Sequence, residues 1–155
     1  MREILIDSHS AMTENERKAL AEALFYIESA SFSDPWSQKM FGEAFANPVI
    51  RSVLLYEDGI LAAYALYALI APEAELLNLA VAPTFRRRGL ARALLDDAER
   101  YLRGQGVTDV YLEVRKSNTA AGTLYRSRGF CEVGVRRAYY RFPTEDAILM
   151  ALRLD

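Results

Sequence analysis

The chain has 155 residues, of which 52% are apolar and 26% are charged, proportions that predict one folded domain over residues 1–155. A single histidine and a single cysteine exclude a structural zinc site, a CxxC redox pair and a disulfide framework, so we expect no metal. The longest apolar run, Ile60 to Ala71, is too short to cross a membrane, and the N-terminus lacks a secretion-signal pattern. We therefore expect a cytoplasmic protein with no membrane partner.

Charge is divided unevenly along the chain. Residues 1–85 carry 5 basic and 12 acidic side chains, a net −7, whereas residues 86–155 carry 14 basic and 9 acidic side chains, a net +5. Sixteen of the 19 basic residues are arginines, which suit bidentate contacts with anions. The C-terminal half is thus a candidate for binding an anion and the N-terminal half for binding a cation, although a mixed solvated surface gives the same numbers.

Two helices are predicted early in the chain. Residues 13–16, Thr-Glu-Asn-Glu, form a capping box, and the apolar residues that follow at helical spacing are Leu20, Leu24 and Ile27. Residues 33–36, Ser-Asp-Pro-Trp, predict the start of a second helix, with Pro35 in its first turn and Asn47 near its end. We expect His9 to lie in a mobile N-terminal stretch and exclude it from catalysis.

Strands and helices then alternate. Strands are predicted over residues 51–56, 60–70, 75–81 and 109–114, and the last two, 130–140 and 147–154, as an antiparallel pair. Helices are predicted over residues 89–103 and from a cap at 117–119 to a point before Gly129. The order ααβββαβαββ predicts an α/β protein with a mixed sheet.

The stretch from Leu76 to Ala91 combines an apolar strand, an arginine-rich loop and a helix start. The first turn of a helix offers unpaired N–H groups and the positive end of the helix dipole, which together bind phosphate. The spacing matches neither the P-loop nor the GxGxxG dinucleotide pattern. Taken alone, the stretch also fits a solvated turn.

Several motifs together resemble the GNAT acetyltransferase superfamily. Arg86-x-x-Gly89-x-Ala91 matches the Arg/Gln-x-x-Gly-x-Gly/Ala loop of that superfamily, and residues 118–130 are similar to its second signature. Within the superfamily, the resemblance is to the bacterial RimI group of ribosomal-protein alanine N-acetyltransferases. The blocks that carry it are residues 32–37, 78–81, 112–118, 136–140 and 145–147.

Two features depart from the RimI pattern. The first 20 residues have no counterpart, and the connection between Tyr140 and Glu145 is short, with Ala138 where asparagine is common. Both differences affect expectations about the acceptor more than those about the donor.

The resemblance implies a GNAT fold, a mixed and mostly antiparallel central sheet flanked by helices, whose central parallel strands splay apart. It implies acetyl-CoA as the donor substrate and the basic N-terminus of a ribosomal protein as the acceptor, with no direct contact to nucleic acid. It also implies Glu113 as the general base, acting through water, and Tyr125 as the general acid that protonates the leaving thiolate.

Both catalytic residues have structural alternatives. Glu113 lies in the apolar run Tyr111-Leu112-Glu113-Val114, where desolvation would raise the pKa of its carboxyl, but alternation also permits a solvated face. Tyr125 also fits a core aromatic at helical spacing.

The remaining site residues follow from the same resemblance. Backbone N–H groups of the strand that contains Leu79 to Val81 would stabilise the thioester oxygen if that strand bulges away from its neighbour. The arginine-rich loop and the helix start that follow this strand would hold the pyrophosphate of the donor. The donor residues are expected to be Leu79, Ala80, Val81, Arg86, Arg87, Arg88, Gly89, Leu90, Ala91, Arg92 and Asn118. The acceptor slot is expected between Trp36, Tyr139 and Tyr140. Acidic residues expected to face a basic peptide are Glu28, Asp34, Glu43, Glu73 and Glu75.

Two alternative functions fit parts of the same sequence. One is a GNAT acetyltransferase that acts on other protein N-termini or on a small amine. The other is a non-enzymatic nucleic-acid-binding module, which is disfavoured because no aromatic residues are interleaved with the arginine cluster.

Overall fold

The structure of the protein is a computed structural model that describes residues 1–155, apart from the side chain of Asp7. Its helices are α1 (Glu14–Ser31), α2 (Gln38–Ala46), α3 (Leu90–Gly104) and α4 (Thr119–Ser127), with a 3-10 turn over Pro83–Phe85. Its strands are β1 (Arg2–Asp7), β2 (Ile50–Glu57), β3 (Ile60–Ile70), β4 (Glu73–Val81), β5 (Asp109–Arg115), β6 (Cys131–Tyr140) and β7 (Glu145–Arg153).

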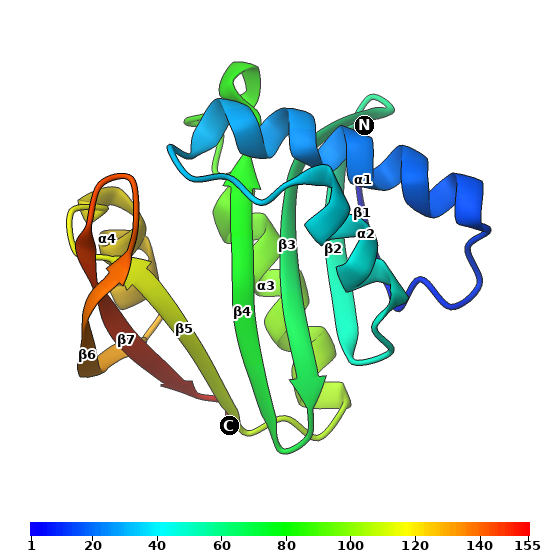
Figure 1. Ribbon diagram of the computed structural model, residues 1–155. Helices are drawn as coiled ribbons and strands as arrows, with labels where there is room; N and C mark the ends of the chain where they lie inside the picture. The colour runs from blue at the N-terminus through cyan, green and yellow to red at the C-terminus, as the bar shows by residue number, and fades with distance from the viewer.

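The described strands form one seven-stranded sheet in the order β1-β2-β3-β4-β5-β7-β6. Its neighbouring strands are antiparallel except β4 and β5, which pair in parallel over Glu73–Leu76 and Asp109–Leu112. Beyond that short pairing the two strands diverge toward their C-terminal ends (Figure 1). The structure therefore confirms the expected GNAT fold, with its splayed central parallel pair.

Helices cover the two faces of the sheet unequally. Helices α1 and α2 lie over β2 to β4 on one face, and α3 lies behind the same strands on the other (Figure 1). The buried side chains of α3 are Leu90, Leu94, Leu95, Ala98, Glu99 and Leu102. Those that α1 and α2 bury on the other face include Leu24, Ile27, Phe41 and Phe45. Each large apolar side chain buried in this way contributes roughly 1.5–3 kcal/mol to folding.

The start of α1 agrees with the sequence, but that of α2 does not. Thr13 caps α1 in the predicted capping box with Glu16. The predicted helix start at residues 33–36 is wrong: α2 begins at Gln38, and its cap is Ser37, whose Oγ accepts from the backbone N of Met40 at 3.1 Å. The reason is a tertiary contact, because the N–H of Trp36 donates to Oε2 of Glu28 at 2.9 Å instead of entering a helix.

Strand β1 and the position of His9 were not predicted. β1 pairs antiparallel with β2, which places it at the edge of the sheet. His9 follows it and is completely buried, with Nε2 2.6 Å from Oγ of Ser52 and its ring 4.5 Å from that of Phe45. The expected mobile stretch is therefore wrong, because His9 is packed between Ser52 of β2 and Phe45 of α2.

Candidate active site

A cleft of about 350 Å³ occupies the region where β4 and β5 separate. The end of α1, the loop before α2, the first half of α4 and the end of β6 complete its walls. Its lining includes Asn78 and eight of the residues that the sequence singled out: Glu28, Asp34, Trp36, Leu79, Glu113, Asn118, Tyr125 and Tyr140. Residues from six elements, far apart in the sequence, thus meet at one break in the sheet.

Strand β4 carries a bulge at the cleft. Leu66 of β3 pairs with Asn78, and Tyr67 pairs with Leu76, so that Leu77 is the extra residue. The strand thus bulges, as stabilisation of the thioester oxygen would require, but at Leu77, whereas Leu79 to Val81 keep regular pairing with β3. A bulge re-aims local backbone groups, and here it lies directly after the last residue that pairs with β5.

Glu113, the expected base, lies on β5 with a charged neighbour. Its Oε1 is 3.0 Å from Nε of Arg136 on β6, and the carboxylate side chain is 18% exposed. Hydrogen bonding to Glu113 raises the pKa of Tyr139. The expected apolar surroundings of Glu113 are therefore incorrect, because β6 brings a guanidinium and a phenol to its carboxylate.

Tyr125, the expected acid, lies on the wall formed by α4. It is 7% exposed, and its ring packs edge-to-face on Phe130 with 5.7 Å between centroids. Burial, and secondarily the nearby Tyr140, raise the pKa of Tyr125 above its ordinary value. The phenol is thus a proton donor at neutral pH that shares the cleft with Glu113.

The arginine-rich loop forms a second, smaller cavity of about 190 Å³ at the start of α3. Its lining includes Val81, Arg87, Gly89, Ala91 and Arg92. Gly89 caps α3 with φ +73°, and Arg87 also has a left-handed backbone with φ +64°. These two turns fold the loop back over the helix start, where backbone N–H groups are unpaired.

The arginines of this loop differ in their contacts. Arg86 donates from Nε to the carbonyl of Val81 at 3.2 Å and from Nη2 to Oγ of Ser31 at 3.1 Å, so it ties the loop to α1. The guanidinium of Arg88 lies 5.2 Å from the ring centroid of Phe85. Arg87 and Arg92 line the small cavity.

A clamp at the end of β5 orients Tyr140, and it was not predicted. Arg115 donates to Oε1 of Glu145 at 3.2 Å and to the carbonyl of Arg141 at 2.6 Å, and its guanidinium lies 4.6 Å from the ring centroid of Tyr140. Glu145 also accepts from the backbone N of Ser117. The signal was present in the sequence, because Arg115 and Glu145 belong to two of the blocks shared with the RimI group.

Asn118 of the second signature and Tyr140 of β6 also line the cleft. Asn118 caps α4, as expected, by accepting from the backbone N of Ala121 at 3.2 Å. Burial raises the pKa of Tyr140 to about 12, with Glu113 as the next cause. Tyr139, by contrast, is half exposed and lies 5.1 Å from Tyr140 between ring centroids.

The five acidic residues expected to face a basic peptide have different environments. Glu43 lies on α2 beside Lys39, 3.9 Å away. Glu28 is 2% exposed and hydrogen-bonded to the protein, so the expectation that it faces a peptide is incorrect. Asp34 lines the main cleft.

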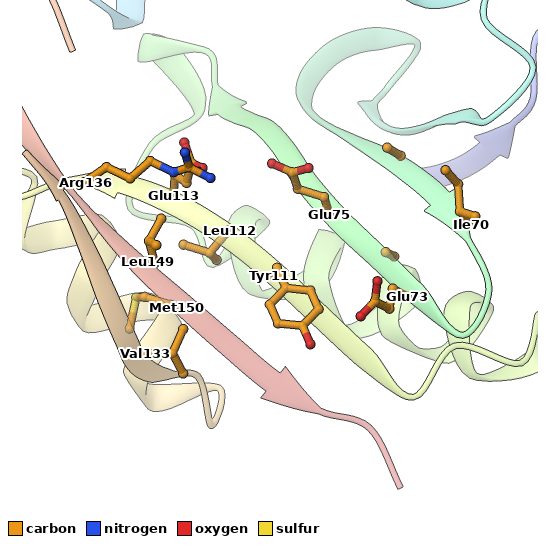
Figure 2. Close-up of a pocket in the computed structure, with 12 residues that line it drawn as sticks. Ile70, Glu73, Glu75, Tyr111, Leu112, Glu113, Val133, Arg136, Leu149 and Met150 are labelled. Carbon is orange, nitrogen blue, oxygen red and sulfur yellow. The ribbon is translucent and has the colours of Figure 1, made fainter. Parts of the chain in front are cut away.

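Glu73 and Glu75 line another cavity of about 350 Å³. It lies on the same face of the sheet as α1 and α2, on a part that neither helix covers. Figure 2 shows both side chains on β4, with the carboxylate of Glu73 toward Tyr111 of β5 and that of Glu75 toward the end of the cavity where Glu113 and Arg136 lie together. Burial, and next the nearby carboxylate of Glu113, raise the pKa of Glu75. Because Glu113 lines both cavities, this acidic groove continues from the cleft.

The residues that the structure describes hold neither a metal-binding group nor a membrane-spanning helix. Among them, no three histidine, cysteine, aspartate or glutamate side chains come together as metal ligands would. None of their helices is long and apolar enough to span a bilayer.

The fold and the cleft are those of a GNAT acetyltransferase, and the chain belongs to this family: the Acetyltransferase (GNAT) family matches residues 21–130. The chain is 44% identical over 141 residues to ribosomal protein bS18-alanine N-acetyltransferase of Escherichia coli (strain K12), covering 86% of this chain and 90% of that protein. The crystal structure of the ribosomal-protein-S18-alanine N-acetyltransferase from Escherichia coli has a TM-score of 0.86 and 37% identity, covering 100% of this chain and 95% of that one. The expected likeness to the RimI group is confirmed.

A more distant structure shares the fold alone. The paiA N-acetyltransferase from Thermoplasma acidophilum, in complex with coenzyme A, has a TM-score of 0.69 and 18% identity, covering 97% of this chain and 99% of that one.

Proposed function

We propose that the protein transfers an acetyl group from acetyl-CoA to the α-amine of the N-terminal alanine of a ribosomal protein. The observation that carries this proposal is the placement of Glu113 and Tyr125 in one cleft, at the break between β4 and β5. The choice of acceptor rests on the similar proteins that are named bS18-alanine N-acetyltransferases. Ribosomal proteins are made in the cytoplasm, so the proposal also places the enzyme there.

The donor would bind along β4 and the start of α3. The small cavity at Arg87, Gly89 and Arg92 suits a pyrophosphate, because arginine side chains and helical N–H groups both favour anions. From there the pantetheine arm would follow β4 past Leu79 toward the bulge at Leu77, as an added strand follows a sheet edge. Asn118, on the opposite wall, would meet the same arm while it caps α4.

The chemistry requires a neutral amine, an oxyanion site and an acid. An α-amine has a pKa of about 8, so that a carboxylate acting through one water is a sufficient base near neutral pH. Glu113 takes this proton while the amine attacks the thioester carbonyl. Backbone N–H groups beside the bulge in β4 stabilise the charge on the carbonyl oxygen. When the intermediate collapses, the carbon–sulfur bond breaks and the phenol of Tyr125 donates its proton to the thiolate.

The acceptor would enter from the face that carries α1 and α2. Trp36 and Tyr140 line the cleft, and Tyr139 lies at its rim beside Glu113, so these three aromatic residues would bound the slot for the first residue. The groove at Glu73 and Glu75 would then receive basic side chains that follow it. Burial, and next the carboxylate of Glu113, raise the pKa of Glu75, and carboxylates gathered in one groove favour a bound cation.

The test is a thiol-release assay with purified protein and acetyl-CoA. A basic peptide that begins with alanine should release coenzyme A, whereas polyamines should not. Release with polyamines alone would instead favour the small-amine alternative. Salt-sensitive nucleic-acid binding without a rise in melting temperature on adding acetyl-CoA would favour the nucleic-acid module.

Charge reversal tests the basic tail separately. Glu73→Lys with Glu75→Lys should raise KM for the basic peptide and leave acetyl-CoA binding unchanged. Glu22→Lys with Glu43→Lys is the matched control, because it reverses the same number of charges on α1 and α2, outside the cleft and the groove. Equal KM values for the two variants would contradict the assigned groove.

A further inference from the structure

Glu28 is a buried carboxylate that joins three elements at the wall of the cleft. Its Oε1 accepts from the hydroxyl of Tyr64 on β3 at 2.5 Å and from Nδ2 of Asn78 on β4 at 2.9 Å. Its Oε2 accepts from the backbone N of Trp36, in the loop before α2, at 2.9 Å. Only 2% of the residue is exposed. These three groups are donors, so the carboxylate acts as a shared acceptor.

The position of these donors relates them to the acceptor side of the cleft. Trp36 lines the cleft from the α1–α2 loop, and Asn78 follows the bulged residue Leu77. Glu28 therefore links the loop that would bound the acceptor slot to the part of β4 where the acetyl group would lie.

Stability alone gives little reason for a carboxylate at this position. Burial raises the pKa of Glu28, while its hydrogen bonds to Tyr64, Trp36 and Asn78 act in the opposite direction. Replacing buried charged groups with well-packed apolar ones is often neutral or stabilising. Its buried neighbours on the same helix, Leu24 and Ile27, are apolar. A costly acceptor is retained where three donors must be held in one arrangement.

We infer that Glu28 is a positioning residue, which fixes the acceptor wall of the cleft by holding the Trp36 loop against β4. The kinetic consequence rests on the proposed function, but the tether itself does not. Glu28 acts through hydrogen bonds rather than through its charge, in contrast to Glu73 and Glu75. This distinction can be tested with two substitutions.

Glu28→Met keeps the approximate volume and removes both acceptors, which releases Trp36. Glu28→Gln removes the charge but keeps a carbonyl that can accept from the N–H of Trp36, and Asn78 can rotate its amide to accept from the new NH2 group. Tyr64→Phe is the matched control, because it removes one donor from Oε1 and leaves the bond to the loop. Positioning predicts that Gln behaves like the wild type and Met does not.

Trp36 provides a direct readout because it is the single tryptophan of the chain. Acrylamide quenching of its fluorescence should increase in Glu28→Met and remain near the wild-type value in Glu28→Gln and Tyr64→Phe. In the wild-type protein, the amide of Trp36 should exchange with solvent more slowly than that of Asp34 in the same loop. This second measurement needs no variant, so it remains decisive if Glu28→Met does not fold.

Kinetics completes the test with acetyl-CoA and an alanine-starting peptide. Glu28→Met should raise KM for the peptide roughly ten- to a hundredfold, as expected for losing a hydrogen bond to a charged group, with KM for acetyl-CoA unchanged. Unchanged quenching in Glu28→Met, fast exchange at Trp36, or equal losses in Glu28→Gln and Glu28→Met would overturn the inference. If wild-type protein acetylates no peptide, the proposed function fails, while quenching and exchange still decide whether Glu28 holds the loop.

Discussion

Nε of Arg136 lies 3.0 Å from Oε1 of Glu113, although β7 separates the two strands that carry them. The carboxylate on β5 therefore already has a cationic partner at the point where the cleft and the acidic groove meet. The guanidinium offsets the charge of the carboxylate, so Glu113 attracts a protonated amine less strongly than an unpaired carboxylate would, whereas a neutral amine is little affected. The pair thus favours the nucleophilic form of the acceptor beside its base.

The first prediction concerns the base. Glu113→Gln should lower kcat by roughly 10²–10⁴, with the larger loss at lower pH, where fewer amines have lost their proton. Acetyl-CoA should still raise the melting temperature to the same extent. Arg136→Gln is the comparison, since it removes the partner and keeps the base, and its kcat should fall much less. Wild-type turnover in Glu113→Gln would refute the assigned role.

The second prediction concerns the acid. Tyr125→Phe should lower kcat about a hundredfold without changing acetyl-CoA affinity, because the ring stays and only the proton donor is lost. Burial raises the pKa of Tyr125, so the phenol remains protonated above its ordinary pKa of about 10. The kcat of the wild type should therefore show no loss of the acid below that pH. A falling limb near pH 9 that disappears in Tyr125→Phe would contradict this environment.

The third prediction concerns stability and pH. Because burial raises the pKa of Glu28 above 4.5, the folded protein binds this proton more tightly than the unfolded chain. Stability from this group should therefore fall as pH rises from 4.5 through its folded pKa. Urea unfolding of the wild type and of Glu28→Gln isolates the effect, since the glutamine does not titrate. The free energy of unfolding of the wild type should decline with rising pH relative to that of the variant. An increase would contradict a raised pKa of Glu28 in the folded protein.

The fourth prediction concerns the loop at the start of α3. Gly89 has φ +73° and open space where a Cβ would lie, so Gly89→Ala should cost about 1–2 kcal/mol through backbone strain alone. It should also weaken acetyl-CoA binding, because the first N–H groups of α3 shift. Gly106→Ala is the control: Gly106 has φ +83° and similar space beyond the other end of α3. Gly106→Ala should lose comparable stability and keep its affinity for acetyl-CoA, as measured by calorimetry. Equal losses of affinity in the two variants would contradict a role of the loop in donor binding.

Local patterns predicted most of the fold. The capping box at Thr13 and the strands predicted over 51–56 and 60–70 depend on neighbouring residues, and the structure confirms them as the cap of α1 and as β2 and β3. The start of α2 failed because the competing partner of Trp36, Glu28, lies on another helix. β1 failed because an edge strand of six residues depends on its pairing with β2, far along the chain.

The candidate site divides in the same way. Motif residues such as Tyr125 and Asn118 could be named because the resemblance fixes their place in the chain. Contacts between distant parts of the chain could not be predicted in this way. Arg136 on β6 pairs with Glu113 across β7, and Glu28 on α1 accepts a hydrogen bond from Asn78 on β4. A bulge in the strand before the arginine-rich loop was only a condition of the expected oxyanion site, and its place at Leu77 could not be predicted, because strand register depends on pairing that sequence does not display.

The most direct test is to locate the acetyl group itself. The protein, acetyl-CoA and a peptide that begins with alanine and carries an internal lysine should be incubated, and the product sequenced by tandem mass spectrometry. The wild type should add one acetyl group, on the α-amine of alanine, and this product should be strongly reduced with Glu113→Gln. Acetylation of the lysine side chain with a free N-terminus, or no transfer to the peptide, would contradict the proposed function.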